Sequence, residues 1–535
     1  MASTYLSRSI AIGNLTLGGF EPVCIQSMTN TDTNDLEATV EQCQRMITAG
    51  AQLVRITTQG KREVEKLAEV RKELRSLEIQ TPVVADIHFK PSLALEAARV
   101  ADKIRINPGN YLGGKSLDLL LPELLETCRQ HETAIRIGVN HGSLDETILN
   151  EFGDTPAGMV ESAMQFLRVC RDREFEKVVV SMKSSNPKVM VQSVRLLVHQ
   201  MSKEGMAYPL HLGVTEAGDG IEGRIKSVVG MAPLLLEGMG DTIRVSLTEA
   251  PEEEMPVALK ILHLFPKPPS LPYHPFNNQA WDPFSFSRRN SHLVAGIGNG
   301  KKIKIISNTP PDPEVDLLPE DIKQRTISYE KWEQHPELLN ESDHLLLLEQ
   351  GLLTIQEVKF RLNHFCSLNQ SAPIIFKTSH TTEDSELFQF QLSGELGSLL
   401  MDGALDAVWV DNVLLDDVLI NDTLLMILQA AGARISKTEF IACPSCGRTH
   451  FDILTRLKEI REATSHLTSL KIGVMGCIVN GPGEMADAHY GYVGAGPGRV
   501  TLYKGKDPRR RNLLEQDALR ALIELMKQEG DWVDP

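Results

Sequence analysis

The sequence has no apolar run of the roughly 18 residues that a membrane-spanning helix needs. Its first residues, Met1 to Gly13, lack the apolar core of a signal peptide and the long Arg- and Ser-rich stretch of a transit peptide. We therefore expect a cytoplasmic protein. Cysteine is also scarce, at 8 of 535 residues. Because the cytoplasm keeps thiols reduced, these cysteines are expected to be core residues or metal ligands rather than disulfides.

Positive charge is in deficit, with 55 Lys and Arg residues against 71 Asp and Glu, a formal net charge of −16. Nucleic-acid binding rewards a basic surface, so this balance argues against a generic nucleic-acid-binding protein. An anionic substrate would have to be held by a local cluster of cations. The 42% hydrophobic and 24% charged residues are typical of a folded protein. The length allows about three or four domains, or fewer if one is a large barrel.

Residues 1–265 alternate short apolar runs with amphipathic helical patterns, at a spacing of about 30 residues. The predicted strands are Val23–Met28, Leu53–Thr58, Val83–His88, Ile104–Asn107, Ala134–Asn140, Val178–Lys183, Leu210–Glu216 and Ile243–Leu247. Eight such units predict a (β/α)₈ TIM barrel. The alternative, an open doubly wound sheet, would more naturally carry a Gly-rich loop after the first strand, where this chain has Ser27-Met28-Thr29-Asn30.

Polar side chains follow these runs, near the predicted carboxyl ends of the strands, which a barrel gathers on one rim. They are Ser27, Arg55, Asp86, His88, Arg105, Asn107, Arg136, Asn140, Lys183, His211, Glu216, Arg244 and Ser246. The five cations among them, Arg55, Arg105, Arg136, Lys183 and Arg244, suit a compact substrate with more than one phosphate. Glu216 and the Asp86/His88 pair could transfer a proton or bind a hydroxyl, although His88 could equally be a structural histidine.

A proline-rich linker is predicted over residues 266–290, followed by a second α/β unit over residues 291–437. This unit has fewer strand patterns than a full barrel, and its only cysteine is Cys366. It shows no clustered cations at its predicted strand ends. We expect a structural insert or spacer.

Residues 438–535 are predicted to form a small α+β domain that carries Cys443-Pro-Ser-Cys446 and, in a glycine-rich loop, Cys477. Three thiolates are an odd number for structural zinc, which prefers four ligands. One interpretation is a [4Fe–4S] cluster on three cysteines, with its fourth iron open or capped by Glu484. A zinc centre completed by His450 or His489 is a second interpretation, and an incidental buried C-x-x-C pair is a third.

Two groups of motifs now point to a family. In the C-terminal domain they are Cys443-Pro-Ser-Cys446-Gly-Arg448 and Gly476-Cys477-Ile-Val-Asn480-Gly-Pro-Gly-Glu484. In the barrel they are Gln26-Ser27-Met28, Ala85-Asp86-Ile-His88-Phe89, Arg105-Ile-Asn107-Pro-Gly109, Gly138-Val-Asn140, Ser181-Met-Lys183 and Gly213-Val-Thr215-Glu216-Ala-Gly218. Together they resemble 4-hydroxy-3-methylbut-2-enyl diphosphate synthase of the methylerythritol phosphate pathway, over residues 5–265 and 438–530. The insert resembles the degenerate barrel of the three-domain form, and the missing plastid transit peptide favours a bacterial source.

The resemblance implies an iron–sulfur oxidoreductase of isoprenoid precursor biosynthesis. Its substrate would be 2-C-methyl-D-erythritol 2,4-cyclodiphosphate, opened by two-electron reductive dehydration to (E)-4-hydroxy-3-methylbut-2-enyl diphosphate. Cys443, Cys446 and Cys477 would ligate a [4Fe–4S] cluster, with Glu484 as a further ligand and catalytic residue. Ferredoxin or flavodoxin would deliver the electrons. The substrate-binding residues would be Arg55, Arg105, Asn107, Arg136, Asn140, Lys183, Arg244 and Ser246, with Glu216 and His88 for proton delivery or hydroxyl binding.

The resemblance also implies a homodimer. The cluster domain would cap either the partner's barrel or, with the insert as a spacer, the barrel of its own chain. Two other functions stay open at this point. One is a non-redox phosphate-binding barrel, similar to the pterin-binding synthases, with a zinc-stabilised tail. The other is an electron-carrier module on an inert barrel, which would not need five convergent cations.

Overall fold

The computed structural model describes residues 5–87, 90–268, 281–339, 343–368, 370–479 and 481–534 of the chain. The chain divides into two compact units. One comprises Tyr5–Ser227, Met239–His263 and Lys437–Pro535, and the other Val228–Gly238 and Leu264–Ser436. The barrel and the cysteine domain therefore belong to the same unit. Within the described ranges, no helix combines the length and the apolar character needed to cross a membrane.

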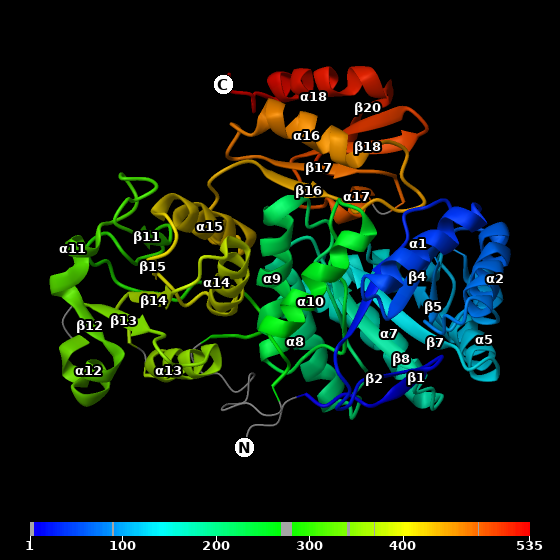
Figure 1. Ribbon diagram of the computed structural model, residues 1–535, viewed down its shortest axis with the longest axis horizontal. Helices are drawn as coiled ribbons and strands as arrows, with labels where there is room; N and C mark the ends of the chain where they lie inside the picture. Colours follow the sequence, from blue (N-terminus) through cyan, green and yellow to red (C-terminus); the bar gives the residue numbers. More distant parts are fainter. Residues whose placement is uncertain are drawn as a thin grey trace. The chain divides into compact units, whose positions relative to one another are not determined.

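A ring of parallel strands forms the centre of the first unit (Figure 1). Its strands are β3 (Cys24–Met28), β4 (Leu53–Thr58), β5 (Val83–Ile87), β6 (Lys103–Ile106), β7 (Ala134–Asn140), β8 (Val178–Lys183), β9 (His211–Leu212) and β10 (Thr242–Ile243). The order β8-β7-β6-β5-β4-β3-β10-β9 is closed by a parallel bridge between Val180 and Leu210. The predicted eight-stranded barrel is confirmed, and the open sheet is wrong.

Helices alternate with the barrel strands, as a (β/α)₈ fold requires. They are α1 (Leu36–Thr48), α2 (Lys61–Ser76), α3 (Pro91–Ala98), α4 (Pro108–Tyr111), α5 (Leu117–Gln130), α6 (Glu146–Phe152), α7 (Pro156–Asp172), α8 (Pro187–Lys203), α9 (Gly220–Leu236) and α10 (Glu254–Leu264). Side-chain caps fix where several of them begin: Asp35 accepts a hydrogen bond from the Ala38 amide of α1, and Thr155 accepts one from Gly158 of α7.

An antiparallel hairpin of β1 (Ile10–Ile12) and β2 (Leu15–Leu17) packs its apolar side chains against the amino-terminal ends of barrel strands. Ile10, Ile12 and Leu17 join Cys24 and Leu53 in one buried cluster. This end of the barrel is thus closed with apolar side chains, which leaves the carboxyl ends of the strands as the polar end.

The C-terminal part of the same unit is a five-stranded mixed sheet of order β16-β17-β18-β19-β20. Its strands are β16 (Glu439–Ala442), β17 (Lys471–Met475), β18 (Tyr490–Gly496), β19 (Arg499–Lys504) and β20 (Asp507–Leu514). The first three are parallel and the last two pair antiparallel. Helices α16 (Ile453–Thr464) and α18 (Glu515–Glu529) share one buried core with the sheet, and the short α17 (Gly481–Glu484) follows β17 (Figure 1).

The amphipathic spacing of residues 513–527 alone predicts a helix that begins at Leu513, but α18 (Glu515–Glu529) begins later. Leu513–Lys527 has helical spacing, but Leu513 pairs with Val500 and Leu514 with Arg499 in the β19–β20 ladder. These ladder contacts outweigh the local helical pattern, so α18 begins only at Glu515.

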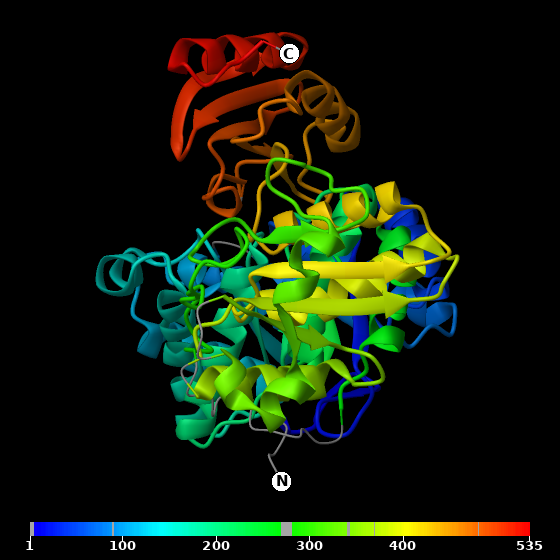
Figure 2. The ribbon, with the colours of Figure 1, turned by 90° about the vertical axis from the view of Figure 1, so that its left-hand side faces the viewer.

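The second unit is built on an all-parallel five-stranded sheet of order β11-β15-β14-β13-β12, seen among its helices in Figure 2. The strands are β11 (Lys304–Ile306), β12 (Thr326–Ser328), β13 (Leu345–Glu349), β14 (Ile374–His380) and β15 (Ala407–Asn412). The helices are α11 (Pro319–Ile322), α12 (Tyr329–Gln334), α13 (Ile355–Ser367), α14 (Ser385–Leu400) and α15 (Asp417–Ala430). First and last strands are neighbours, as in a barrel with fewer strands. Residues 269–280 of the predicted linker lie outside the described residues.

Candidate active site

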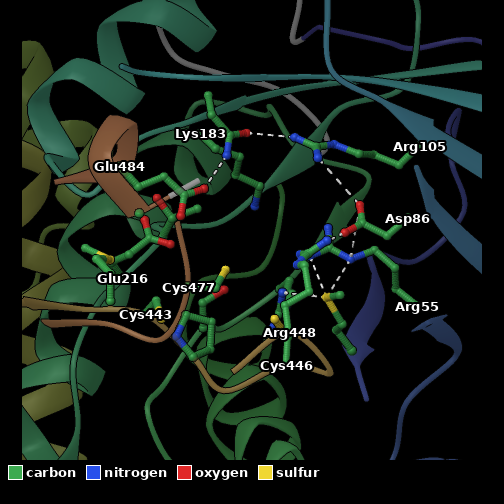
Figure 3. A pocket seen from close by; sticks show the side chains of 18 of the residues that line it. Arg55, Asp86, Arg105, Lys183, Glu216, Cys443, Cys446, Arg448, Cys477 and Glu484 are labelled. Atoms are coloured by element: carbon green, nitrogen blue, oxygen red, sulfur yellow. Dashed lines mark hydrogen bonds and ion pairs between the residues drawn. The ribbon is translucent and has the colours of Figure 1, made fainter. Parts of the chain in front are cut away.

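The candidate site is a cavity at the carboxyl ends of the barrel strands, where the loops that follow β16 and β17 also lie (Figure 3). The predicted site residues that line it are Arg55, Arg105, Arg136, Asn140, Lys183, Glu216, Arg244, Ser246, Cys443, Cys446, Cys477 and Glu484. Two separate sequence segments, predicted independently, thus contribute to one cavity.

Two predicted residues do not join this set. His88 lies outside the described residues, so its role stays a prediction. Asn107 is buried but is not among the residues that line the cavity. Its side-chain oxygen accepts a hydrogen bond of 3.2 Å from the Gly109 amide and caps α4, which explains an asparagine at the end of β6 without a substrate.

Two cations of the cavity, Arg136 and Lys183, have buried nitrogens without a hydrogen-bond partner in the described part of the chain. Nε and Nη1 of Arg136 and Nζ of Lys183 have no hydrogen-bond partner among the described residues, and their residues are 2% and 6% exposed. Burial lowers the pKa of Lys183 well below its usual value, and Arg136 lowers it further. Burial also lowers the pKa of Arg55 to about 10, but this value still leaves its guanidinium charged at neutral pH. Buried cationic side chains whose N–H groups lack acceptors favour an anionic ligand, which would also stabilise their charged forms.

Asp86 holds several of these cations in place. Its Oδ1 lies 3.5 Å from Nη1 of Arg105 and 4.0 Å from Nε of Arg55, and its Oδ2 lies 3.3 Å from Nη2 of Arg448. Arg105 also donates from Nη2 to Oδ1 of Asn140 at 3.0 Å. The guanidinium groups are therefore oriented before any ligand binds, which reduces the loss of side-chain freedom on binding.

Two carboxyl groups, those of Glu216 and Glu484, lie next to each other in the cavity (Figure 3). Burial raises the pKa of Glu216 well above its ordinary value, and the adjacent Glu484 carboxylate raises it further. Asn140 donates from Nδ2 to Oε1 of Glu484 at 2.5 Å. Glu216 has a φ of 49°, an unusual conformation for a residue other than glycine, which the surrounding site must hold.

The three cysteines line the same cavity from the C-terminal sheet. Cys443 follows β16 and Cys477 follows β17, whose parallel pairing brings their carboxyl ends together. Sγ of Cys443 accepts a hydrogen bond from the Gly476 amide at 3.2 Å. Burial raises the pKa values of Cys443 and Cys477, and neighbouring cysteine thiolates raise both further. Thiols that disfavour each other's ionisation suit a positively charged metal centre.

The donor set fits an iron–sulfur cluster better than zinc. Across the described ranges, no three His, Cys, Asp or Glu side chains lie close enough together to hold one metal ion. A cluster does not require that, because each cysteine binds a different iron. His489, one of the candidate zinc ligands, already accepts a hydrogen bond at Nδ1 from the Lys471 amide at 3.0 Å.

The barrel and the C-terminal domain of one chain meet at this cavity through close backbone contacts. A β-carbon on Gly142 would lie 1.9 Å from the Gly483 carbonyl oxygen, so only glycine permits this approach. A parallel β-bridge between Ala217 of the barrel and Ala442 of β16 is a second backbone contact between the two domains. The sequence left open whether the cluster domain caps its own barrel or a partner's, and the structure has both parts within one chain.

Asp86 and His211, which the sequence placed at the rim, also line the cavity, whereas Met28, Thr215 and Arg448 line it without having been predicted. Asp86 and His211 stand at strand ends, so their position was a usable signal. Both ring nitrogens of His211 are buried without a hydrogen-bond partner in the described part of the chain. Arg448 could have been suspected only from its place directly after Cys446-Gly447.

Comparison with known proteins agrees with this geometry. The family model for the GcpE TIM-barrel domain matches residues 7–259, and that for the GcpE protein C-terminal domain matches residues 439–528. The chain is 42% identical to 4-hydroxy-3-methylbut-2-en-1-yl diphosphate synthase (flavodoxin) of Parabacteroides distasonis, over 98% of both chains. It is 36% identical to the chloroplastic, ferredoxin-type synthase of Arabidopsis thaliana, over 99% of this chain and 88% of the relative.

A solved dihydropteroate synthase of Burkholderia cenocepacia overlaps 49% of this chain and 98% of its own, at 16% identity and a TM-score of 0.35. An overlap of that quality carries no argument about function. The family matches and the full-length relatives do: the chain belongs to the GcpE family of oxidoreductases.

Proposed function

We propose that this protein reduces 2-C-methyl-D-erythritol 2,4-cyclodiphosphate to (E)-4-hydroxy-3-methylbut-2-enyl diphosphate, with two electrons and two protons consumed and one water released. The observation that carries the proposal is one cavity lined by five cationic side chains of the barrel, two adjacent glutamates and three cysteines. The full-length relatives are named for the corresponding synthase.

The barrel side chains would bind the two phosphates of the cyclodiphosphate. Arg136 and Lys183 offer N–H groups that have no partner among the described residues, and Arg55, Arg105 and Arg244 add charge around them. Glu254 fixes Arg244, with Oε1 at 3.4 Å from Nη2. Charge-assisted contacts of this kind are each worth about 1.5–3 kcal/mol, which is enough to overcome the net negative charge of the chain locally. Asn140 and Ser246 would add hydrogen bonds.

Cys443, Cys446 and Cys477 would hold a [4Fe–4S] cluster, with Glu484 as a further ligand. When bound, such a cluster supplies electrons singly and an iron that can act as a Lewis acid. Asn140 fixes the carboxylate of Glu484, and Ser185 donates to its backbone carbonyl at 3.3 Å. The three cysteines are half-buried where they line the cavity.

Glu216 would deliver a proton to the hydroxyl group that leaves as water. Its carboxyl is buried, its pKa is raised well above the ordinary value, and its Oε2 has no hydrogen-bond partner among the described residues. A carboxylic acid with a raised pKa is a suitable general acid at neutral pH. His88 remains a second candidate for this role.

The electron donor would be flavodoxin or ferredoxin, as the names of the relatives indicate for those proteins. We place the reaction in the cytoplasm, with no membrane or nucleic-acid partner.

The proposal is tested by purification without oxygen, iron and acid-labile sulfide analysis, and turnover of the cyclodiphosphate with a chemical reductant. We expect about four irons and four sulfides per chain and formation of the product. Cys477→Ala should lose the brown chromophore and the activity, whereas Cys366→Ala, a buried cysteine of the second unit, should keep both. Zinc without sulfide, or an intact cluster with no turnover, would refute the proposal.

A further inference from the structure

Arg448 enters the cavity from the loop between β16 and α16. Cys446 donates its backbone amide to Oγ1 of Thr449 at 3.0 Å, and Thr449 returns its amide to the Cys446 carbonyl at 2.9 Å. A β-carbon on Gly447 would lie 2.7 Å from the Thr31 carbonyl oxygen of the barrel. The loop is therefore pressed against the barrel, and its next residue, Arg448, points inward with 8% of its side chain exposed.

One edge of the Arg448 guanidinium is bound to the barrel. Nη2 lies 3.3 Å from Oδ2 of Asp86, whose side chain is 1% exposed. Oδ1 of the same carboxylate lies 3.5 Å from Nη1 of Arg105. Figure 3 shows Asp86 between these two guanidinium groups. Asp86 thus joins Arg448, from the loop that carries Cys443 and Cys446, to Arg105, one of the five cations of the barrel.

The other edge of Arg448 has no such partner. Nε and Nη1 are buried and make no hydrogen bond within the part of the chain that the structure describes. Arg448 lines the same cavity as Cys446 and Cys477. A guanidinium group, which is charged at any physiological pH, thus shares a cavity with these two cysteines, and two of its nitrogens have no hydrogen-bond partner among the described residues.

We propose that Arg448 is a positioning residue that sets the reduction potential of the cluster, and that Asp86 moderates this effect and ties it to the substrate cavity. The inference rests on the proposed cluster. A positive charge and N–H donors near cluster sulfurs stabilise the reduced, more negative state and so raise the potential. The negative charge of the Asp86 carboxylate lowers the potential, because it partly cancels the charge of Arg448.

The two residues should therefore move the potential in opposite directions. Arg448→Gln removes the charge, and at a fixed donor potential it should lower the ratio of reduced to oxidised cluster about tenfold, which is about 59 mV for one electron. Asp86→Asn leaves the charge of Arg448 less compensated and should raise that ratio. A purely structural disturbance would not give opposite signs.

The measurement is a redox titration of the anaerobic holoenzyme, followed by electron paramagnetic resonance. Arg461→Gln is the matched control, because Arg461 also joins the C-terminal domain to the barrel, with Nη1 at 3.1 Å from Oδ2 of Asp219, but does not line the cavity. Its potential should equal that of the unmodified protein. An unchanged potential in Arg448→Gln, or shifts of the same sign in both variants, would overturn the inference.

Loss of the cluster in a variant or in the unmodified protein also has a definite meaning. If Arg448→Gln assembles no cluster, Asp86→Asn carries the test alone, and a potential that stays or falls contradicts the inference. If the unmodified protein holds no cluster, the proposed function fails together with the inference. Normal turnover with unmoved potentials in the variants would defeat only the role of Arg448.

Discussion

At the scale of single residues, the cavity contains buried cationic groups that lack hydrogen-bond acceptors among the described residues. Arg136 and Lys183 are buried cations whose partners are missing among the described residues, and burying such groups destabilises a folded protein. An anionic ligand supplies the missing partners, so binding recovers free energy that folding alone leaves unused. This is why we assign these side chains to substrate rather than to the stability of the barrel.

Replacing Arg136 by Ala should mainly weaken substrate binding. One lost charge-assisted contact is worth about 1.5–3 kcal/mol, which corresponds to a KM raised roughly tenfold to 150-fold. Steady-state kinetics with a chemical reductant measures this. Arg99→Ala, an exposed arginine after α3, is the control and should leave KM unchanged. If Arg136→Ala kept both KM and kcat, the assignment of the barrel cations to substrate binding would be wrong.

His211 makes stability depend on pH. Burial, and then the charge of Lys183, depress its pKa well below the ordinary value, so the folded protein keeps the ring neutral. The unfolded chain binds a proton below about pH 6.5, and stability is therefore lost as the pH falls through that value. His211→Gln should lose less Tm than the unmodified protein between about pH 7.5 and about pH 5.5. Parallel losses in both proteins would speak against a buried neutral imidazole.

The cations of the site could be predicted from sequence because a parallel barrel brings its strands together around one cavity, and Arg55, Arg105 and Arg136 each lie on one of these strands. The ion pair between Asp86 and Arg448 could not. It joins residues that are 362 positions apart, and no local pattern records a contact between two domains. Asn107 shows the opposite case, since capping a helix is a local role that also selects asparagine, and its role in substrate binding stays a prediction.

At the scale of elements, the last two barrel strands are shorter than their apolar runs. Hydrogen-bonded pairing ends at Leu212 in β9 and at Ile243 in β10. Gly213, with a φ of 152°, turns the chain there, and a β-carbon on it would lie 2.2 Å from the Arg244 carbonyl oxygen and 2.4 Å from Nζ of Lys183. The apolar pattern predicted the strands, but it could not show where the ladder breaks to form the cavity.

Gly213→Ala should therefore displace Lys183 and Arg244 and raise KM, while the cluster chromophore of the C-terminal domain remains. The paired variant is Gly205→Ala, whose φ of 71° is also unfavourable for alanine but whose β-carbon would have nothing within 4 Å. Comparing KM for the two separates the close contact from backbone strain. An equal effect of both substitutions on KM would show that the contact at Gly213 does not matter.

At the scale of the whole chain, barrel and cysteine domain form one site although the second unit separates them in the sequence. Backbone contacts such as Gly142 with Gly483 and the bridge of Ala217 with Ala442 are made within one chain. The sequence could predict both halves of the site, because each has its own motifs. It could not predict that they close within a chain, since the length of an insert does not determine which domains meet. The homodimer stays a prediction.

Mixing two inactive variants tests closure within the chain. Cys477→Ala and Glu216→Gln should each have little activity, because each lacks a different half of the site. When they are unfolded and refolded together, or co-expressed, activity should not return, since no chain then carries an intact site. Activity well above the sum of the separate variants would show that the site is built across two chains.

The most direct test of the whole account is the electron paramagnetic resonance spectrum of the reduced, anaerobic protein with and without 2-C-methyl-D-erythritol 2,4-cyclodiphosphate. If the substrate is held by the barrel cations against a cluster on Cys443, Cys446 and Cys477, its addition should change the g values of the cluster signal. In Arg136→Ala the same change should require more substrate. A cluster signal that stays the same at a substrate concentration that saturates turnover would contradict the account.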